Sequence, residues 1–255
     1  MLIDAHCHLD FPDFDADREA MFERARAVGV EHFVVPGTTR SRWSAVLALG
    51  ERADISVCLG LHPYFIAEHV DDDVEALPHA IDAHPEVVAV GECGIDARFT
   101  ETLDAQWALF DAQLRLAKSR RLPVVIHCVR ANDPVAKRLR QLDLPAGGLI
   151  HAFAGSEEQA KRFIDLGFVV GLGGAVTHER AQRLRRAVAS LPEDGYVLET
   201  DSPDMPMAGY LGMRNEPARV VKVCEVVAAL RDQSFDNVAA QSTANAYRLF
   251  GISKE

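Results

Sequence analysis

The first apolar run of the chain ends in a short segment, "DAHCHLD", that is rich in side chains able to bind metals or transfer protons. Within it, His6 and His8 are two positions apart, and Cys7 lies between them. If the run is a β-strand, alternate side chains point to the same side, so the two histidines form a pair while Cys7 points away. Neutral imidazoles are common ligands of Zn²⁺ and similar ions. The segment therefore favours a histidine-based metal site over a thiolate site.

Similar polar residues stand at or just past the ends of other apolar runs. They are His62, Glu92, His127, His151 and Asp201. Polar groups so close to a core are costly unless they serve a purpose. Such a set of histidines and acids exceeds what one ion needs and suits two ions about 3.5–4 Å apart, bridged by a carboxylate and a water. It predicts a hydrolytic centre in which a metal-bridging hydroxide is the nucleophile.

The apolar runs that carry these residues are typical of parallel strands buried on both faces. The predicted strands span residues 2–6, 32–36, 55–62, 87–93, 123–128, 148–153, 168–174 and 196–201. Helical patterns cover 15–29, 40–52, 72–83, 102–121, 133–142, 156–166, 178–190, 216–231 and 236–250. This alternation predicts a (β/α)8 TIM barrel, with an open doubly wound sheet as the alternative. In a barrel, the C-terminal strand ends would bring the polar residues to one mouth.

Length and composition agree with one enzyme domain. The chain has 255 residues without an evident linker or repeat, so a single domain over residues 1–255 is expected. The net charge of −11 excludes a broad basic face that coats duplex DNA, although metal ions can still attract a phosphate. No apolar run reaches the ~20 residues of a membrane helix, and no secretory signal is visible. A cytoplasmic protein, with a monomer favoured, is the expectation.

Weaker features bear on substrate binding. The segment "GLGGAV" at 171–176 follows the seventh predicted strand, where barrels often bind phosphate, but a tight turn is favoured. Arg130 and Arg214 lie in loops expected near the mouth, where each could hold a phosphate or form a surface ion pair. Asp4, on the same strand face as His6, is predicted to orient an imidazole. Five further histidines are expected to be structural: His32, His69, His79, His84 and His178.

Taken in order, the motifs resemble those of the TatD family of metal-dependent deoxyribonucleases, within the amidohydrolase-type barrel superfamily. The motifs are "IDAHCHLD", "GLHP", "VGECGID", "PVVIHC", "HAFAG" and "LETDSPDMP…RNEP". The resemblance runs from Ile3 to at least Pro217, and the last segment looks most like the YjjV-type branch. Departures from the family pattern, "HCVR", "HPYF" and "GIDARF", fall on the expected substrate contacts and spare the expected metal ligands.

The resemblance implies a TIM barrel with two divalent ions, which could be Zn²⁺, Mn²⁺, Mg²⁺ or Fe²⁺. The implied ligands are His6, His8 and Asp201 for one ion, His127 and His151 for the other, and Glu92 as the bridge. His62 would face the substrate and contact its phosphate. Asp201 would also act as the general base that orients the attacking water.

Three functions remain in competition. The first is a deoxyribonuclease that hydrolyses phosphodiester bonds in DNA from a 3′ end, acting on single strands or strand ends. The second keeps the metal centre but cleaves another ester or an amide, as a D-aminoacyl-tRNA deacylase does. The third is a non-catalytic metal-binding protein, whose usual sign is missing ligands, and none of the implied ligands is missing here.

Overall fold

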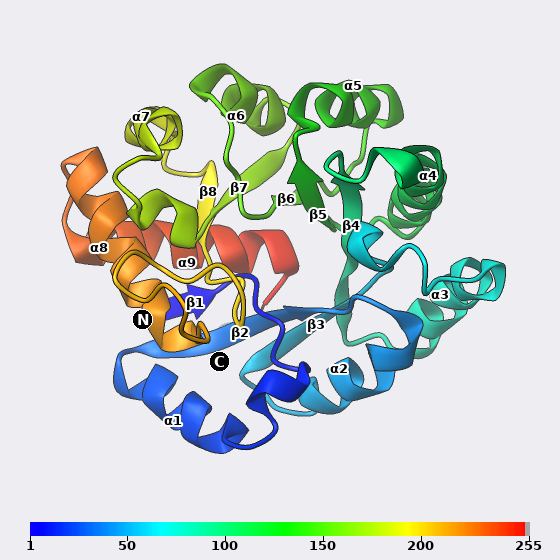
Figure 1. The fold of residues 1–255 in the computed structure, drawn as a ribbon, viewed down its shortest axis with the longest axis horizontal. Coiled ribbons are helices and arrows are strands. Elements are labelled where there is room, and N and C mark those ends of the chain that lie inside the picture. Colours follow the sequence, from blue (N-terminus) through cyan, green and yellow to red (C-terminus); the bar gives the residue numbers. More distant parts are fainter. Residues whose placement is uncertain (253–255) are drawn as a thin grey trace.

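Eight parallel strands pair side by side in the order in which they occur in the chain. Strands β1 to β8 span Leu2–Asp4, Val30–Pro36, Ile55–Leu59, Val87–Asp96, Val124–Val129, Gly148–Ile150, Phe168–Leu172 and Tyr196–Leu198. The computed structural model describes residues 1–252, and helices surround the strands on all sides (Figure 1). Ala5 N donates to Leu198 O at 3.0 Å and so connects the ends of β1 and β8. The predicted (β/α)8 barrel is confirmed.

Helices follow the strands in regular alternation. Helices α1 to α8 span Arg18–Ala27, Trp43–Leu49, Asp71–Ala83, Leu103–Arg120, Asn132–Leu142, Glu157–Ile164, Gln182–Ser190 and Val220–Arg231, and α9 spans Phe235–Phe250. In α4, the apolar side chains of Phe110, Leu114 and Ala117 are fully buried. Spacings of three and four residues place these side chains on one face. Among residues 1–252, no helix has both the length and the apolar character needed to cross a bilayer.

Strand alternation decides which side chains fill the barrel. The inward layer consists of small and branched residues, Ile3, Val34, Cys58, Ala89, Val125, Leu149, Val169 and Val197. Helix α9 lies against the N-terminal end of the barrel, where Asn245 Nδ2 donates to Tyr196 O at 2.8 Å. On the same helix, Ala246 and Phe250 pack against the inward layer. Apolar side chains of α9 therefore close the inward layer at this end.

Five strands, β1, β3, β6, β7 and β8, end earlier than the sequence predicts, and β1 and β8 show the consequence. Strand β1 ends at Asp4 and β8 at Leu198, ahead of the predicted ends at residues 6 and 201. His6 and Asp201 therefore lie on irregular segments beyond the paired strands. These two segments bond to each other instead, because Asp201 N donates to His6 O at 2.9 Å. The cross-link brings the two predicted ligands together although they are far apart in the chain.

Strand β4 continues further than predicted. It runs to Asp96 rather than to residue 93, and it stays paired with β5, where Gly94 lies opposite His127. Glu92 therefore lies within the strand and not at its end. Since side chains alternate along a strand, Glu92 and Asp96 belong to the same side.

Candidate metal centre

Glu92 lies at the centre of the C-terminal mouth, fully buried, with imidazoles on both carboxylate oxygens. Its Oε2 lies 3.1 Å from His6 Nε2 and 3.3 Å from His8 Nε2. Its Oε1 lies 3.2 Å from His127 Nδ1 and 2.8 Å from His151 Nε2. Side chains from three segments, after β1, on β5 and after β6, thus converge on one acid.

Asp201 completes the group around Oε2. Its Oδ1 lies 3.4 Å from His6 Nε2 and 3.5 Å from His8 Nε2. We call His6, His8 and Asp201 the Oε2 cluster, and His127 and His151 the Oε1 cluster. Cys7 stays outside both, since its buried thiol points to Val34 O at 3.7 Å.

Both clusters have the spacing of metal ligands. His6 Nε2 and His8 Nε2 lie 3.3 Å apart, as do His127 Nδ1 and His151 Nε2. Tetrahedral Zn²⁺ with bonds of about 2.0–2.1 Å separates its ligand atoms by roughly 3.3 Å. Oε2 of Glu92 is buried and has no hydrogen-bond partner among the described residues. The donor atoms therefore fit a divalent cation on each side of Glu92.

The two acids at the centre are carboxylates at neutral pH. Burial alone would raise the pKa of Glu92, but the imidazoles of His151, His62 and His6 outweigh burial and hold it well below its usual range. Burial acts on Asp201 in the same direction, and hydrogen bonds from the imidazoles of the Oε2 cluster lower its pKa far below the usual value. The ionised form is the one that binds cations or accepts a proton.

His62 is a hydrogen-bond donor to Glu92. Tyr64 N donates to His62 Nδ1 at 3.0 Å, so this nitrogen carries the lone pair and Nε2 carries the proton. Nε2–H then donates to Glu92 Oε1 at 2.9 Å. Burial lowers the pKa of His62 to about 4, which keeps the ring neutral. Both ring nitrogens are engaged, so the phosphate contact expected from the sequence would require one of them to be released.

Asp96 is an acid that the sequence reasoning missed. Its Oδ2 lies 3.1 Å from His127 Nε2, so this nitrogen donates and Nδ1 is free to face Glu92. Arg98 donates to both carboxylate oxygens of Asp96, at 2.9 and 2.5 Å. Burial would raise the pKa of Asp96, but Arg98 and then His127 outweigh it and lower the pKa. The sequence could have indicated this acid, because Glu92 and Asp96 are four positions apart in "GECGID" and so lie on the same side of the strand.

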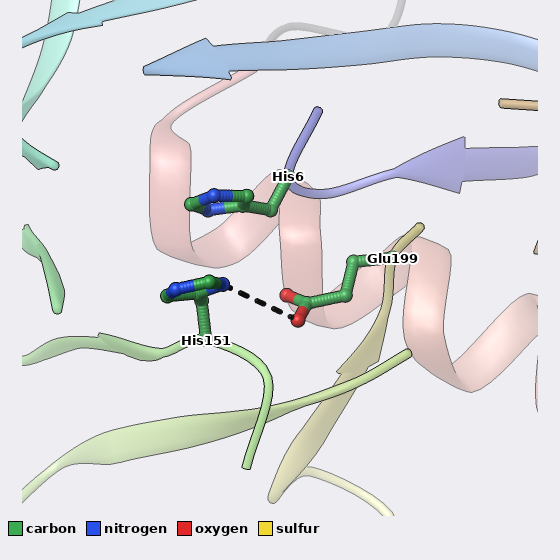
Figure 2. Close-up of side chains that lie close together, drawn as sticks. All are labelled: His6, His151 and Glu199. Carbon is green, nitrogen blue, oxygen red and sulfur yellow. Dashed lines mark ion pairs between the residues drawn. The ribbon is translucent and has the colours of Figure 1, made fainter. Parts of the chain in front are cut away.

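Glu199 is the second acid that was missed. It is fully buried, and its Oε1 lies 3.7 Å from His151 Nδ1 (Figure 2). Ala152 N donates to the same oxygen at 2.5 Å. A Cβ at Gly171 would lie 2.1 Å from Oε2 of this acid. The first glycine of "GLGGAV" therefore makes room for a carboxylate, and the segment continues as a 3₁₀ turn over Gly174–Thr177. The sequence could have indicated this acid, because Glu199 stands two positions before Asp201 in "ETD".

Asp4 has a different role from the one predicted. Its carboxylate accepts from Thr200 N at 2.9 Å, from Thr200 Oγ1 at 2.5 Å and from His6 N at 3.4 Å. Burial raises the pKa of Asp4 to about 8. Asp4 thus joins the backbone after β1 to the backbone after β8, and these hydrogen bonds involve no imidazole nitrogen. The strand ends at Asp4, so alternation does not carry its face on to His6.

The two arginines predicted to hold phosphate lie elsewhere. Arg130 is exposed, and the cavity lining within residues 1–252 includes neither arginine. Arg214 donates to both oxygens of Asp17, at 2.7 and 2.8 Å, and its guanidinium lies over the Phe14 ring at 4.7 Å. The long segment after β8 folds towards the start of α1, which draws Arg214 away from the mouth.

The histidines predicted to be structural lie apart from the two clusters. Their partners are Ser56 for His32, the carbonyl of His62 for His69, Glu86 for His84 and the carbonyl of Pro206 for His178. His79 lies on α3, between β3 and β4 in the chain.

A cavity of about 690 Å³ opens over Glu92. Its wall includes Tyr64, Phe65 and Arg98. Tyr64 is 58% exposed and packs edge to face on Phe65 and Phe99, with ring centroids 5.3 and 5.6 Å apart. The floor of the cavity is a histidine–carboxylate centre, and its rim offers aromatic and cationic side chains.

The barrel and its mouth define a class, the metal-dependent barrel hydrolases. Residues 3–251 match the family model described as TatD related DNase. The chain is 42% identical to the metal-dependent hydrolase YjjV of Escherichia coli K12, over 98% of either protein. It is 35% identical to the 3′-5′ ssDNA/RNA exonuclease TatD of Rahnella sp. strain Y9602, over 96% of this chain and 97% of that protein. The chain belongs to the TatD family of metal-dependent hydrolases, as its motifs predict.

A solved structure agrees. The crystal structure of the TatD homologue YjjV from E. coli K12 matches with a TM-score of 0.95 and 41% sequence identity. The match covers 99% of this chain and 98% of that one. The arrangement of the barrel is thus shared with that member of the family.

Proposed function

We propose that this hydrolase is a two-ion phosphodiesterase that removes nucleotides from the 3′ end of single-stranded DNA. The observation that carries the proposal is the placement of one ligand cluster on each oxygen of Glu92. Pairs of cations about 3.5–4 Å apart are widely used for in-line displacement at phosphorus. The name of the Rahnella relative supports a single-stranded nucleic acid as the substrate class.

The proposed ligand sets follow from the geometry. They are His6 Nε2, His8 Nε2 and Asp201 for one ion, His127 Nδ1 and His151 Nε2 for the other, with one oxygen of Glu92 towards each. Bound Zn²⁺, Mn²⁺, Mg²⁺ or Fe²⁺ would neutralise charge on the scissile phosphate and lower the pKa of water.

Side chains of the protein would orient the reactants and move the proton. Asp201, whose side chain is 13% exposed, would accept a proton from the attacking water. The water oxygen bonds to phosphorus while the bond from phosphorus to the leaving 3′ oxygen breaks, and solvent returns a proton to that oxygen. His62 would keep Glu92 oriented through its Nε2–H donation.

The rim of the cavity supports a strand end as the substrate. Base stacking on an exposed aromatic side chain contributes about 1–3 kcal/mol per base and tolerates any sequence. Tyr64 offers such a ring, and Arg98 stands beside it in the cavity wall. A net charge of −11 argues against wrapping a duplex, so a single strand entering the cavity is the better fit.

The test compares metal-free and metal-loaded protein on one substrate. Protein stripped with a chelator is reloaded with Mn²⁺ or Zn²⁺ and incubated with a 5′-labelled single-stranded oligonucleotide. We expect stepwise shortening from the 3′ end in the reloaded sample alone, and none when the 3′-terminal linkages are phosphorothioates. Deacylation of D-aminoacyl-tRNA without nucleotide release from DNA or RNA would overturn the nuclease proposal while leaving the metal centre intact.

Tyr64 provides a separate test of the substrate. Tyr64→Ala should raise KM for the oligonucleotide about tenfold, which corresponds to about 1.4 kcal/mol of stacking. The rate with a small chromogenic phosphodiester should not change. Val70→Ala is the matched control, since Val70 is 60% exposed and lies outside the cavity over Glu92. Equal loss on both substrates would mean that Tyr64 supports the centre and not the base.

A further inference from the structure

A stacked pair of imidazoles stands beside a buried acid that the proposed ligand sets do not use (Figure 2). The rings of His6 and His151 are nearly parallel, with 8° between their planes and 3.9 Å between their centroids. Each ring turns Nε2 towards Glu92. A ring nitrogen of each histidine and a carboxylate oxygen of Glu199 lie within 4.8 Å of one another.

The opposite edge of each ring lacks a partner. Nδ1 of His6 and Nδ1 of His151 are buried and accept or donate no hydrogen bond within the part of the chain that the structure describes. A neutral imidazole carries one proton, so a ring that gives the lone pair of Nε2 to a cation has its proton on Nδ1. A buried N–H requires an acceptor. For His151, Glu199 Oε1 lies 3.7 Å from that nitrogen.

The surroundings of Glu199 fit this role. The side chain is fully buried, Ala152 N donates to its Oε1, and its Oε2 has no partner within residues 1–252. A buried carboxylate is costly unless it receives further hydrogen bonds. Gly171 has no Cβ where one would lie 2.1 Å from Oε2, so the seventh strand leaves the space that the acid occupies.

His127 already makes a hydrogen bond to an acid of the kind that we infer for His151. Its Nε2 faces Asp96 at 3.1 Å, and its Nδ1 faces Glu92. The two histidines of the Oε1 cluster therefore use opposite ring nitrogens as ligands, and each has an acid behind the other nitrogen. Glu199 stands behind His151 as Asp96 stands behind His127.

A separate cation held by His6, His151 and Glu199 is the competing explanation. With Nε2 of each ring directed at the centre around Glu92, such a cation would need the second nitrogen of both rings to be deprotonated as well. That would turn two neutral imidazoles into anions, which have far higher proton affinity than the neutral ligands that metal sites use. With a proton on each Nδ1, both imidazoles stay neutral and Glu199 can accept their hydrogen bonds, so neither ring has to become an anion.

We propose that Glu199 is a positioning residue of the metal centre. It accepts the Nδ1–H of His151, which fixes the tautomer that presents Nε2 to a cation. Its Oε2, which has no partner within residues 1–252, can accept the Nδ1–H of His6 in the same way. The inference rests on the two-ion centre proposed above. It assigns a role to the first acid of "ETD" that is separate from the ligand role of Asp201.

The experiment measures metal affinity in three proteins by competition with a chelating dye. They are the wild type, Glu199→Gln, and Asp4→Asn as the matched control, because Asp4 is equally buried beside the centre and its partners are Thr200 and a backbone N–H. Loss of an acid behind a ligating histidine typically weakens binding 10–100-fold. We expect a loss of about that size in Glu199→Gln and less than threefold in Asp4→Asn. The visible spectrum of the Co²⁺-loaded protein should change in Glu199→Gln alone.

The outcomes separate this inference from the proposed centre. If the wild type binds no divalent ion, the two-ion centre fails. If the wild type binds ions and Glu199→Gln matches it in affinity and Co²⁺ spectrum, the role of Glu199 is overturned and the centre stands. An equal loss in Asp4→Asn would also overturn it, since any buried acid at this end would then have the same effect.

A measurement on the wild type covers the case in which Glu199→Gln does not fold. Nitrogen-15 NMR of the histidine rings in the Zn²⁺-loaded protein reports which nitrogen carries the proton. We expect a slowly exchanging Nδ1–H on His151 and, for His127, the opposite tautomer. A proton on Nε2 of His151 would contradict the proposal.

Discussion

The two oxygens of Glu92 face different surroundings. Oε2 meets the cluster in which Asp201, a second carboxylate, directly contacts the imidazoles. Oε1 lies next to imidazoles whose other ring nitrogen faces a second carboxylate, as Nε2 of His127 faces Asp96. A carboxylate among the ligands places its full charge next to a cation, whereas a carboxylate behind an imidazole acts only by raising the basicity of that ring. We therefore expect the Oε2 cluster to hold its ion more tightly.

The largest effect should come from the acid common to both clusters. Glu92→Gln removes the charge shared by the two sides, so we expect loss of both metal equivalents by elemental analysis. Metal ions contribute several kcal/mol to such reactions, so hydrolysis should fall by about three orders of magnitude. Two equivalents retained in a folded Glu92→Gln protein would refute the central place of this acid.

Asp201→Asn should weaken metal binding at the Oε2 cluster only. It removes the carboxylate of the Oε2 cluster and leaves His127 and His151 in place, so about one metal equivalent should remain. Activity should fall about 10²–10³-fold, because the proposed proton acceptor is lost together with the ion. Metal content and rate are measured on the same sample. Loss of both ions would show that the two clusters depend on each other.

Asp96→Asn should weaken the Oε1 side without abolishing it. The expected loss in metal affinity is about 10–100-fold, because His127 keeps its place but loses its anionic partner. Activity should return when the metal concentration is raised in a titration. Asp54→Asn, which changes an acid paired with Arg26 and Arg52 away from the mouth, is the control. A defect that excess metal does not repair would argue against a role in metal affinity.

The smallest effect concerns Arg214, which lies outside both sides of the centre. Hydrogen bonds from Arg214 and then Arg24 lower the pKa of Asp17, so this contribution to stability is present above the unfolded-state pKa of about 4 and is lost as pH falls through the lower folded-state value. Arg214→Ala should cost about 0.5–1 kcal/mol at pH 7 in urea unfolding, and the difference should shrink below pH 4.

The same variant tests the phosphate contact predicted from the sequence. Because the guanidinium is bound to Asp17, KM for an oligonucleotide should be unchanged in Arg214→Ala. Arg130→Ala, at the other predicted phosphate contact, is the companion variant. A severalfold rise in KM for Arg214→Ala would restore the sequence-based prediction.

Much of the centre could be read from the sequence because burial restricts where polar residues are tolerated. His127 and Glu92 interrupt apolar strands, and few explanations other than a site account for such residues. The strand order then follows from alternation with helices, and the barrel brings the strand ends together.

The tertiary structure decided which nitrogen of each ring faces Glu92 and which acid stands behind it. Those choices join residues from different strands, as in the contact of His127 with Asp96 across β5 and β4. It also decided that Arg214 binds Asp17, because the segment after β8 folds towards α1. Periodicity reports the face of a single strand, and it carries no information on the distance between two side chains that meet only after the barrel closes. The sequence by itself therefore determined the fold and the candidate ligands, and the packing of distant segments determined their partners.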